Sequence, residues 1–200
     1  MNPLNTVAGT LTGGVVLAIL VAALSGGVSP LEDSMMMWLH VLSGITWIGL
    51  LYYFTLVQVP ALSDAANDEG GPGGSGITKY VAPRALWWFR WGAVFTWLTG
   101  ASYLLRKGLL DDAFLLGFGP NGTTSAFVIG VGAWLGTIML FNVWVFIWPN
   151  QKKVLGLVEA SADEIAAAKR TAFLASRTNT LLSIPMLMSM VGYGHGGFFL

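Results

Sequence analysis

The sequence predicts an all-α integral membrane protein, a bundle of about five transmembrane helices. Hydrophobic residues make up 54% of the chain and charged residues only 10%, whereas soluble domains carry about 25% charged residues. The chain also contains five apolar stretches, each close to the roughly 20 residues that a helix needs to cross a bilayer. Residues 1–200 are therefore expected to form a single membrane domain, with the lipid bilayer as its surrounding partner.

The five predicted spans follow one another along the chain. They run approximately over Thr10–Val28, Met35–Val59, Ala85–Leu105, Ser125–Trp148 and Phe173–Tyr193. A flexible glycine-rich loop is expected over residues 63–79, because glycine-rich segments behave as flexible coils. A polar cytoplasmic helix is expected over about residues 152–172, leading into the fifth span. Ser161 and Glu164 have the spacing of a capping box near its start.

The positions of lysine and arginine predict the orientation, since cytoplasmic loops carry an excess of these residues. Most of the basic residues lie in two connections, the second-to-third and the fourth-to-fifth: Lys79, Arg84, Lys152, Lys153, Lys169 and Arg170. Arg106 and Lys107, in the third-to-fourth connection, oppose this trend. The N-terminus is expected to be cytoplasmic and the C-terminus external.

The chain has only two histidines, His40 and His195. His40 lies near the outer start of the second span, and His195 follows the outer end of the fifth. A buried polar ring is costly in a bilayer, so an intramembrane histidine is by default a candidate site. Gly44, one helical turn after His40, and the nearby Trp47 are the other candidate cofactor-binding residues.

Three interpretations of these histidines remain open on the residues alone. They are axial ligands of the iron of one haem b, or they lie beside another metal or a quinone, or they are hydrogen-bonded structural residues. Small residues such as Gly44 let a flat macrocycle approach a helix, but they also let helices pack closely without a cofactor. Met186, Met188 and Met190 are expected to fill lipid-facing or core space rather than to ligate iron.

Composition excludes several classes of function. The absence of cysteine excludes disulfides, thiolate metal sites and a c-type haem attached through Cys-x-x-Cys-His. The 10 basic and 10 acidic residues cancel, so no nucleic-acid partner is expected. No nucleophile constellation and no hydrophilic catalytic domain are evident. No catalytic residue is assigned, and any enzymatic activity is expected to be that of an oxidoreductase acting with partner subunits.

Three separated motifs resemble, in order, the membrane domain of the bacterial membrane-bound urate oxidases, also called urate hydroxylases. The motifs are Leu39–Gly49, Asn142–Lys153 with its Trp-Pro-Asn-Gln-Lys-Lys turn, and Arg177–Met186 followed by His195. The first motif is also similar to copper-resistance and protoporphyrinogen-oxidase-like membrane proteins. The resemblance to urate oxidases therefore depends on all three motifs together.

The resemblance implies a helical domain of the bacterial inner membrane. In the full-length family this domain is joined to a C-terminal cytochrome c domain, which receives electrons from urate. Because this chain has no cysteine, a separate c-type cytochrome or a larger respiratory complex is expected to take that place. Two functions follow: a redox protein or subunit carrying haem b near the outer face, or a cofactor-free accessory or assembly subunit of a larger membrane enzyme complex.

Overall fold

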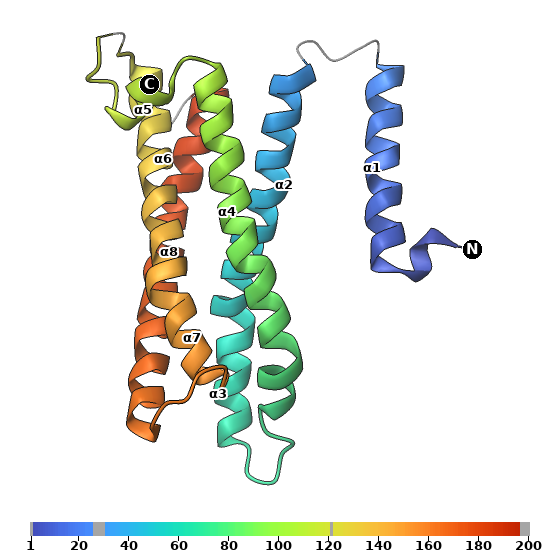
Figure 1. Cartoon of the computed structure of the whole chain (residues 1–200), viewed down its shortest axis with the longest axis vertical. Coiled ribbons are helices and arrows are strands. Elements are labelled where there is room, and N and C mark those ends of the chain that lie inside the picture. The colour runs from blue at the N-terminus through green and yellow to red at the C-terminus, as the bar shows by residue number, and fades with distance from the viewer. Residues whose placement is uncertain (1, 26–30, 121, 197–200) are drawn as a thin grey trace.

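The computed structural model describes residues 2–25, 31–120 and 122–196 (Figure 1). Within these ranges the chain forms helices and turns and no strand, which confirms the predicted all-α class. The elements, in chain order, are η1 (Pro3–Asn5), α1 (Val7–Leu24), α2 (Leu31–Tyr53), η2 (Phe54–Gln58), α3 (Val59–Asn67), η3 (Ile77–Val81), α4 (Ala82–Arg106), α5 (Leu110–Phe114), α6 (Thr124–Phe141), η4 (Asn142–Ile147), α7 (Trp148–Val154) and α8 (Ala162–His195).

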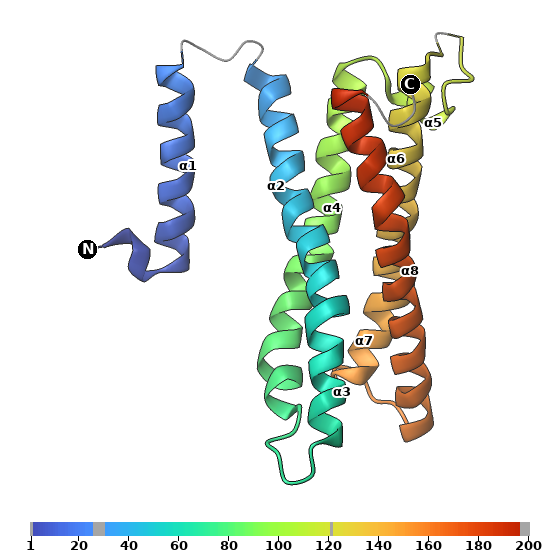
Figure 2. The same cartoon turned by 180° about the vertical axis from the view of Figure 1, so that it is seen from behind.

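Four long helical segments form one elongated bundle. α2 packs chiefly against α4, and α6 packs chiefly against α8, with weaker contacts joining the two pairs. Both views show α1 standing apart from this bundle, beside α2 (Figures 1 and 2). The start of α2 and the end of α8 lie at one end of the bundle, and α3 and α7 lie towards the other.

The helical stretches that correspond to the second to fifth predicted spans are longer than those spans. Helical structure is continuous from α2 through η2 into α3, and again from α6 through η4 into α7. Residues 26–28, the end of the first predicted span, lie outside the described residues. The irregular part of the glycine-rich connection is limited to residues 68–74, because helical turns extend into it from both sides.

The connection before the last helix also differs from the single polar helix expected there. α7 ends at Val154, turns follow, and α8 begins at Ala162 and continues unbroken to His195. The Glu164 N–H donates to the Ser161 side chain at 3.3 Å, and the Ser161 N–H donates to the Glu164 carboxylate at 2.9 Å. The predicted capping box is therefore confirmed.

In the described part of the chain, three helical stretches are long and apolar enough to cross a membrane. These are Val7–Leu24, Glu32–Asn67 and Thr124–Val154. α4 and α8 are also long, but they contain more polar residues and are less apolar on average than the three stretches. The composition of the three stretches is that of a membrane-associated protein.

Small residues on α4 allow α2 to pack closely against it. Gly92, Thr96 and Gly100 recur every four residues and so lie on one face of α4. A Cβ atom at Gly92 would lie 3.3 Å from the backbone nitrogen of Trp47. The Trp47 side chain is 2% exposed in the resulting core, as expected where small residues let two helix backbones approach.

Polar side chains link α8 to its neighbours at mid-bundle. Asn179 of α8 is fully buried; its amide donates to the Met139 carbonyl at 3.0 Å and accepts from Asn142 at 2.9 Å. The Tyr52 hydroxyl lies 3.0 Å from the Ser183 hydroxyl. These hydrogen bonds fix α8 against α6, η4 and α2, because a polar group left unpaired in an apolar surrounding is costly.

Ion pairs connect the start of α2 to the end of α4. Arg106 donates to Glu32 and, at 3.0 Å, to Asp33, while Lys107 donates to Asp33 at 2.7 Å. The two basic residues that oppose the predicted orientation are therefore paired with carboxylates of the neighbouring helix.

Candidate functional site

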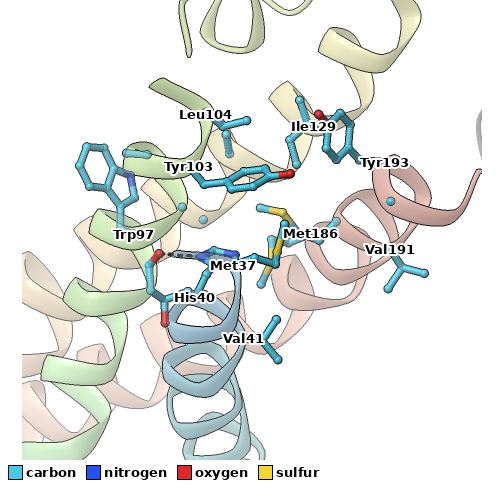
Figure 3. A pocket seen from close by; sticks show the side chains of 18 of the residues that line it. Met37, His40, Val41, Trp97, Tyr103, Leu104, Ile129, Met186, Val191 and Tyr193 are labelled. Carbon is cyan, nitrogen blue, oxygen red and sulfur yellow. Dashed lines mark hydrogen bonds between the residues drawn. The ribbon is translucent and has the colours of Figure 1, made fainter. Parts of the chain in front are cut away.

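A cavity of about 520 Å³ lies at the end of the bundle where α2 begins and α8 ends (Figure 3). α2, α4, α6 and α8 all contribute to its wall, which is mostly apolar. Its volume lies within the range of about 300–1,000 Å³ that is typical of small-molecule and cofactor sites. Three of the four predicted site residues line it: His40, Trp47 and His195.

The α4 helix positions the His40 ring. Nδ1 of His40 donates to the Thr96 carbonyl at 2.8 Å, and since a carbonyl only accepts, the ring hydrogen is on Nδ1. The other ring nitrogen, Nε2, then has a free lone pair, which is the form of imidazole that binds a metal. Gly100 leaves room for the ring, because a Cβ atom there would lie 2.8 Å from His40 Cε1.

His195 has the same arrangement at the last residue of α8. Its Nδ1 lies 3.3 Å from the Val191 carbonyl, one turn earlier in the helix, so Nε2 again has the free lone pair. His195 is exposed, whereas His40 is half-buried. The two imidazoles thus reach the same cavity from two helices, each with Nδ1 bonded to a backbone carbonyl.

The structure separates the roles of Gly44 and Trp47. Gly44 is not among the residues that line the cavity, and a Cβ atom there would lie 3.8 Å from the Thr96 methyl group. It follows His40 by one turn on the same face, where that face meets α4. Trp47 does line the cavity, and its buried Nε1 has no hydrogen-bond partner among the described residues. A bound molecule with an acceptor group would satisfy this donor.

Several lining residues were not identified from the sequence. They are Thr96, Gly100, Tyr103, Gly132, Gly136 and Tyr193. The four-residue spacing of Gly132 and Gly136 could have predicted part of this wall, because it places small residues on one helix face. Met186 and Met190 also line the cavity, whereas Met188 does not. The thioethers that were expected only to fill space therefore include two that could reach a bound group.

Residues 121–199 match the family model described as urate oxidase N-terminal. This part of the chain is therefore similar to the N-terminal domain of urate oxidases. It includes α6, η4, α7 and α8, and with them His195 and two of the three motifs that resemble membrane-bound urate oxidases. His40 and Trp47 lie outside the matched residues, so the cavity lies between the matched part of the chain and a wall formed by α2 and α4. No curated protein and no solved structure matches the chain.

The residues around the cavity are compatible with a b-type haem. Two imidazoles offer Nε2 atoms, Gly136 leaves open space on the α6 wall, and Trp47 offers an unpaired donor. The described residues include no group of three or more His, Asp or Glu side chains that could hold a metal ion. The lining residues that could ligate a haem iron are two imidazoles, the methionine thioethers and the phenols of Tyr103 and Tyr193.

Proposed function

We propose that the chain is a membrane-integral redox protein, or a redox subunit, that holds one haem b between His40 and His195. The observation that carries this proposal is that both histidines line one apolar cavity with Nδ1 hydrogen-bonded to a carbonyl. A metal-ligating histidine usually donates its second ring N–H to such an acceptor, which fixes the tautomer and the ring orientation. When bound, the haem would supply one-electron transfer.

Thr96 and Gly100 act as positioning residues in this proposal. The Thr96 carbonyl keeps the hydrogen of His40 on Nδ1, and Gly100 leaves the space in which the ring lies. The apolar wall excludes water from the site, which favours a neutral imidazole as the metal ligand. Trp47 would donate its unpaired Nε1–H to an acceptor on the bound group.

We further propose that α4 and α8 cross the bacterial inner membrane together with the three more apolar stretches. Both lie alongside α2 and α6 over the length of the bundle (Figure 1), and most lysine and arginine residues lie at the end opposite Arg106 and Lys107. With that end cytoplasmic, the histidines lie at the outer face. A separate c-type cytochrome or a larger respiratory complex would accept electrons there.

The alternative function is a cofactor-free accessory or assembly subunit of a larger membrane enzyme complex. α1 supports it, because this apolar helix stands apart from the bundle and no part of its span is buried in the chain itself. A helix that is apolar all round is normally covered by protein or lipid. In the accessory role, α1 would pack against a membrane helix of the partner enzyme.

The reduced-minus-oxidised optical spectrum of the purified protein distinguishes the two functions. We expect low-spin b-type bands that are lost in His40→Ala and in His195→Ala, and Met188→Leu is the control that keeps them. If His195→Ala keeps the bands and Met186→Leu loses them, the second ligand is the Met186 thioether and paired histidine ligation is wrong. If protein produced with ample haem shows no such bands, the accessory role is favoured.

A further inference from the structure

A second cavity, of about 570 Å³, lies at the end of the bundle opposite the histidines. Residues of η2, α3, η3, α4, η4, α7 and α8 line it. The only charged side chains among these lining residues are Lys169 and Arg177, and both are basic. The charge of the wall therefore favours an anionic ligand.

All three π-helical segments in the described part of the chain contribute to this cavity. Gln58 comes from η2, Thr78 from η3 and Ile147 from η4. A π-helical turn inserts an extra residue into an α-helix and is frequently found at functional sites. Three π-helical segments around one cavity therefore favour the interpretation that the cavity binds a ligand.

Gln58 supplies an unpaired polar group inside this wall. The residue is 8% exposed, and its Oε1 has no hydrogen-bond partner among the described residues. A buried amide oxygen without a partner is destabilising, so a donor from outside the chain is expected to meet it. In contrast, the neighbouring Thr55 hydroxyl is already paired with Thr180 at 2.8 Å.

The cavity changes from apolar to basic along its length. Phe54, Leu86 and Phe89 form an apolar part that belongs to the bundle core. Lys169 and Arg177 lie on exposed turns of α8, about 12 Å apart along the helix axis. The ligand that matches this wall is an amphipathic anion with a hydrogen-bond donor in its polar part.

We propose that this cavity binds an anionic phospholipid whose head group carries a hydroxyl. The phosphate would meet Lys169 and Arg177, a head-group hydroxyl would donate to Gln58, and an acyl chain would cover Phe54, Leu86 and Phe89. Basic pockets between transmembrane helices are known sites for such head groups. The proposal is independent of haem binding, because the two cavities lie at opposite ends of the bundle.

Native mass spectrometry of the purified chain in detergent can test this proposal. The probes are phosphatidylglycerol, phosphatidylcholine and phosphatidic acid with identical acyl chains. Phosphatidylglycerol is expected to bind most tightly, because it alone combines net negative charge with alcohol hydroxyls in its head group. The double variant Lys169→Gln, Arg177→Gln is expected to lose on the order of tenfold or more of this affinity. The matched control is Lys152→Gln, Arg170→Gln, which removes the same charge from the same end but outside the cavity wall.

A second variant tests the hydroxyl contact. Gln58→Leu is expected to weaken the binding of phosphatidylglycerol and to leave that of phosphatidic acid unchanged, since the amide contacts only a head-group alcohol. Variants are compared only after circular dichroism shows wild-type helicity, and single substitutions replace any double variant that fails. Equal binding of phosphatidylglycerol and phosphatidylcholine, or equal losses in the two charge pairs, would overturn the proposal. So would full displacement of phosphatidylglycerol by millimolar inorganic phosphate, which would identify a free-anion site.

Discussion

A single glycine determines where the His40 imidazole can lie. Gly100 faces the ring so closely that a Cβ atom would come within 2.9 Å of Nδ1, the atom that donates to Thr96. Contacts below about 3 Å require one of the groups to move, and overpacking a close-packed site typically costs about 1–3 kcal/mol. Because α4 supplies both the glycine and the carbonyl acceptor, a methyl group at residue 100 would disturb both at once.

We therefore expect Gly100→Ala to lower thermal stability and to alter the b-type spectrum, through displacement of the His40 ring. Gly49→Ala is the matched control, since it places the same methyl group on a helix where no neighbouring atom lies within 4 Å. Thermal unfolding in detergent and the reduced optical spectrum measure the two effects. Equal stability and identical spectra for both variants would show that the ring is not held against α4.

Each cavity contains one buried polar atom that the described residues leave unpaired. Trp47 Nε1 is the donor near the histidines, and Gln58 Oε1 is the acceptor in the basic cavity. Buried polar groups in proteins are nearly always hydrogen-bonded. If the two proposals hold, the haem would present an acceptor to Trp47 and the phospholipid would present a donor to Gln58.

At the scale of elements, the start of α8 depends on an exposed electrostatic cap. The pKa of Glu164 lies below its ordinary value of 4.5, chiefly because the Ser161 backbone N–H donates to its carboxylate, and further because Lys153 lies at 3.3 Å. A carboxyl group with a lowered pKa in the folded state stabilises that state at pH values above its unfolded pKa. This contribution is lost as the pH falls through the folded pKa.

The first turn of α8 is accordingly expected to loosen below about pH 4, where the unfolded form of Glu164 binds a proton more readily than the folded form. Hydrogen exchange of the amides of residues 162–166, corrected for intrinsic rates, measures this change. Glu164→Gln is the control and should show no loss of protection over the same interval. The idea fails if the wild type and the glutamine variant lose protection in parallel.

The whole molecule has two chemically different ends. The histidine end carries paired charges, since Arg106 and Lys107 are bound to Glu32 and Asp33. The opposite end carries the basic cavity and most of the remaining lysine and arginine residues. This asymmetry is the physical basis for the proposed orientation, because the excess of positive charge on cytoplasmic loops sets the topology of membrane proteins.

The orientation can be tested directly because the chain has no cysteine. Single cysteines at exposed positions of the two ends, Asp111→Cys and Pro72→Cys, are exposed to a membrane-impermeant thiol reagent in intact cells. Asp111→Cys should react at once, and Pro72→Cys should react only after the cells are permeabilised. The opposite pattern would place both histidines at the cytoplasmic face and exclude an external cytochrome as electron acceptor.

The sequence by itself determined the helical class, the approximate helix positions and the Ser161–Glu164 cap. All three depend on local patterns, since hydropathy, length and capping act over a few consecutive residues. The helix ends were less predictable, because the residue at which a helix ends also depends on the segments that pack against it. The irregular part of the glycine-rich connection accordingly covers only residues 68–74 of the predicted 63–79.

Only the tertiary structure decided what surrounds each histidine and where the second cavity lies. Which residue of α4 faces His40, and whether Gly44 meets a cavity or a helix, depend on how two helices are rotated and offset. Spacing within one helix does not specify that offset. The π-helical turns that bring Gln58, Thr78 and Ile147 to one wall depend in the same way on contacts between distant segments. The sequence therefore identified the histidines; packing between helices supplied the partner of His40, whereas the partner of His195 comes from its own helix.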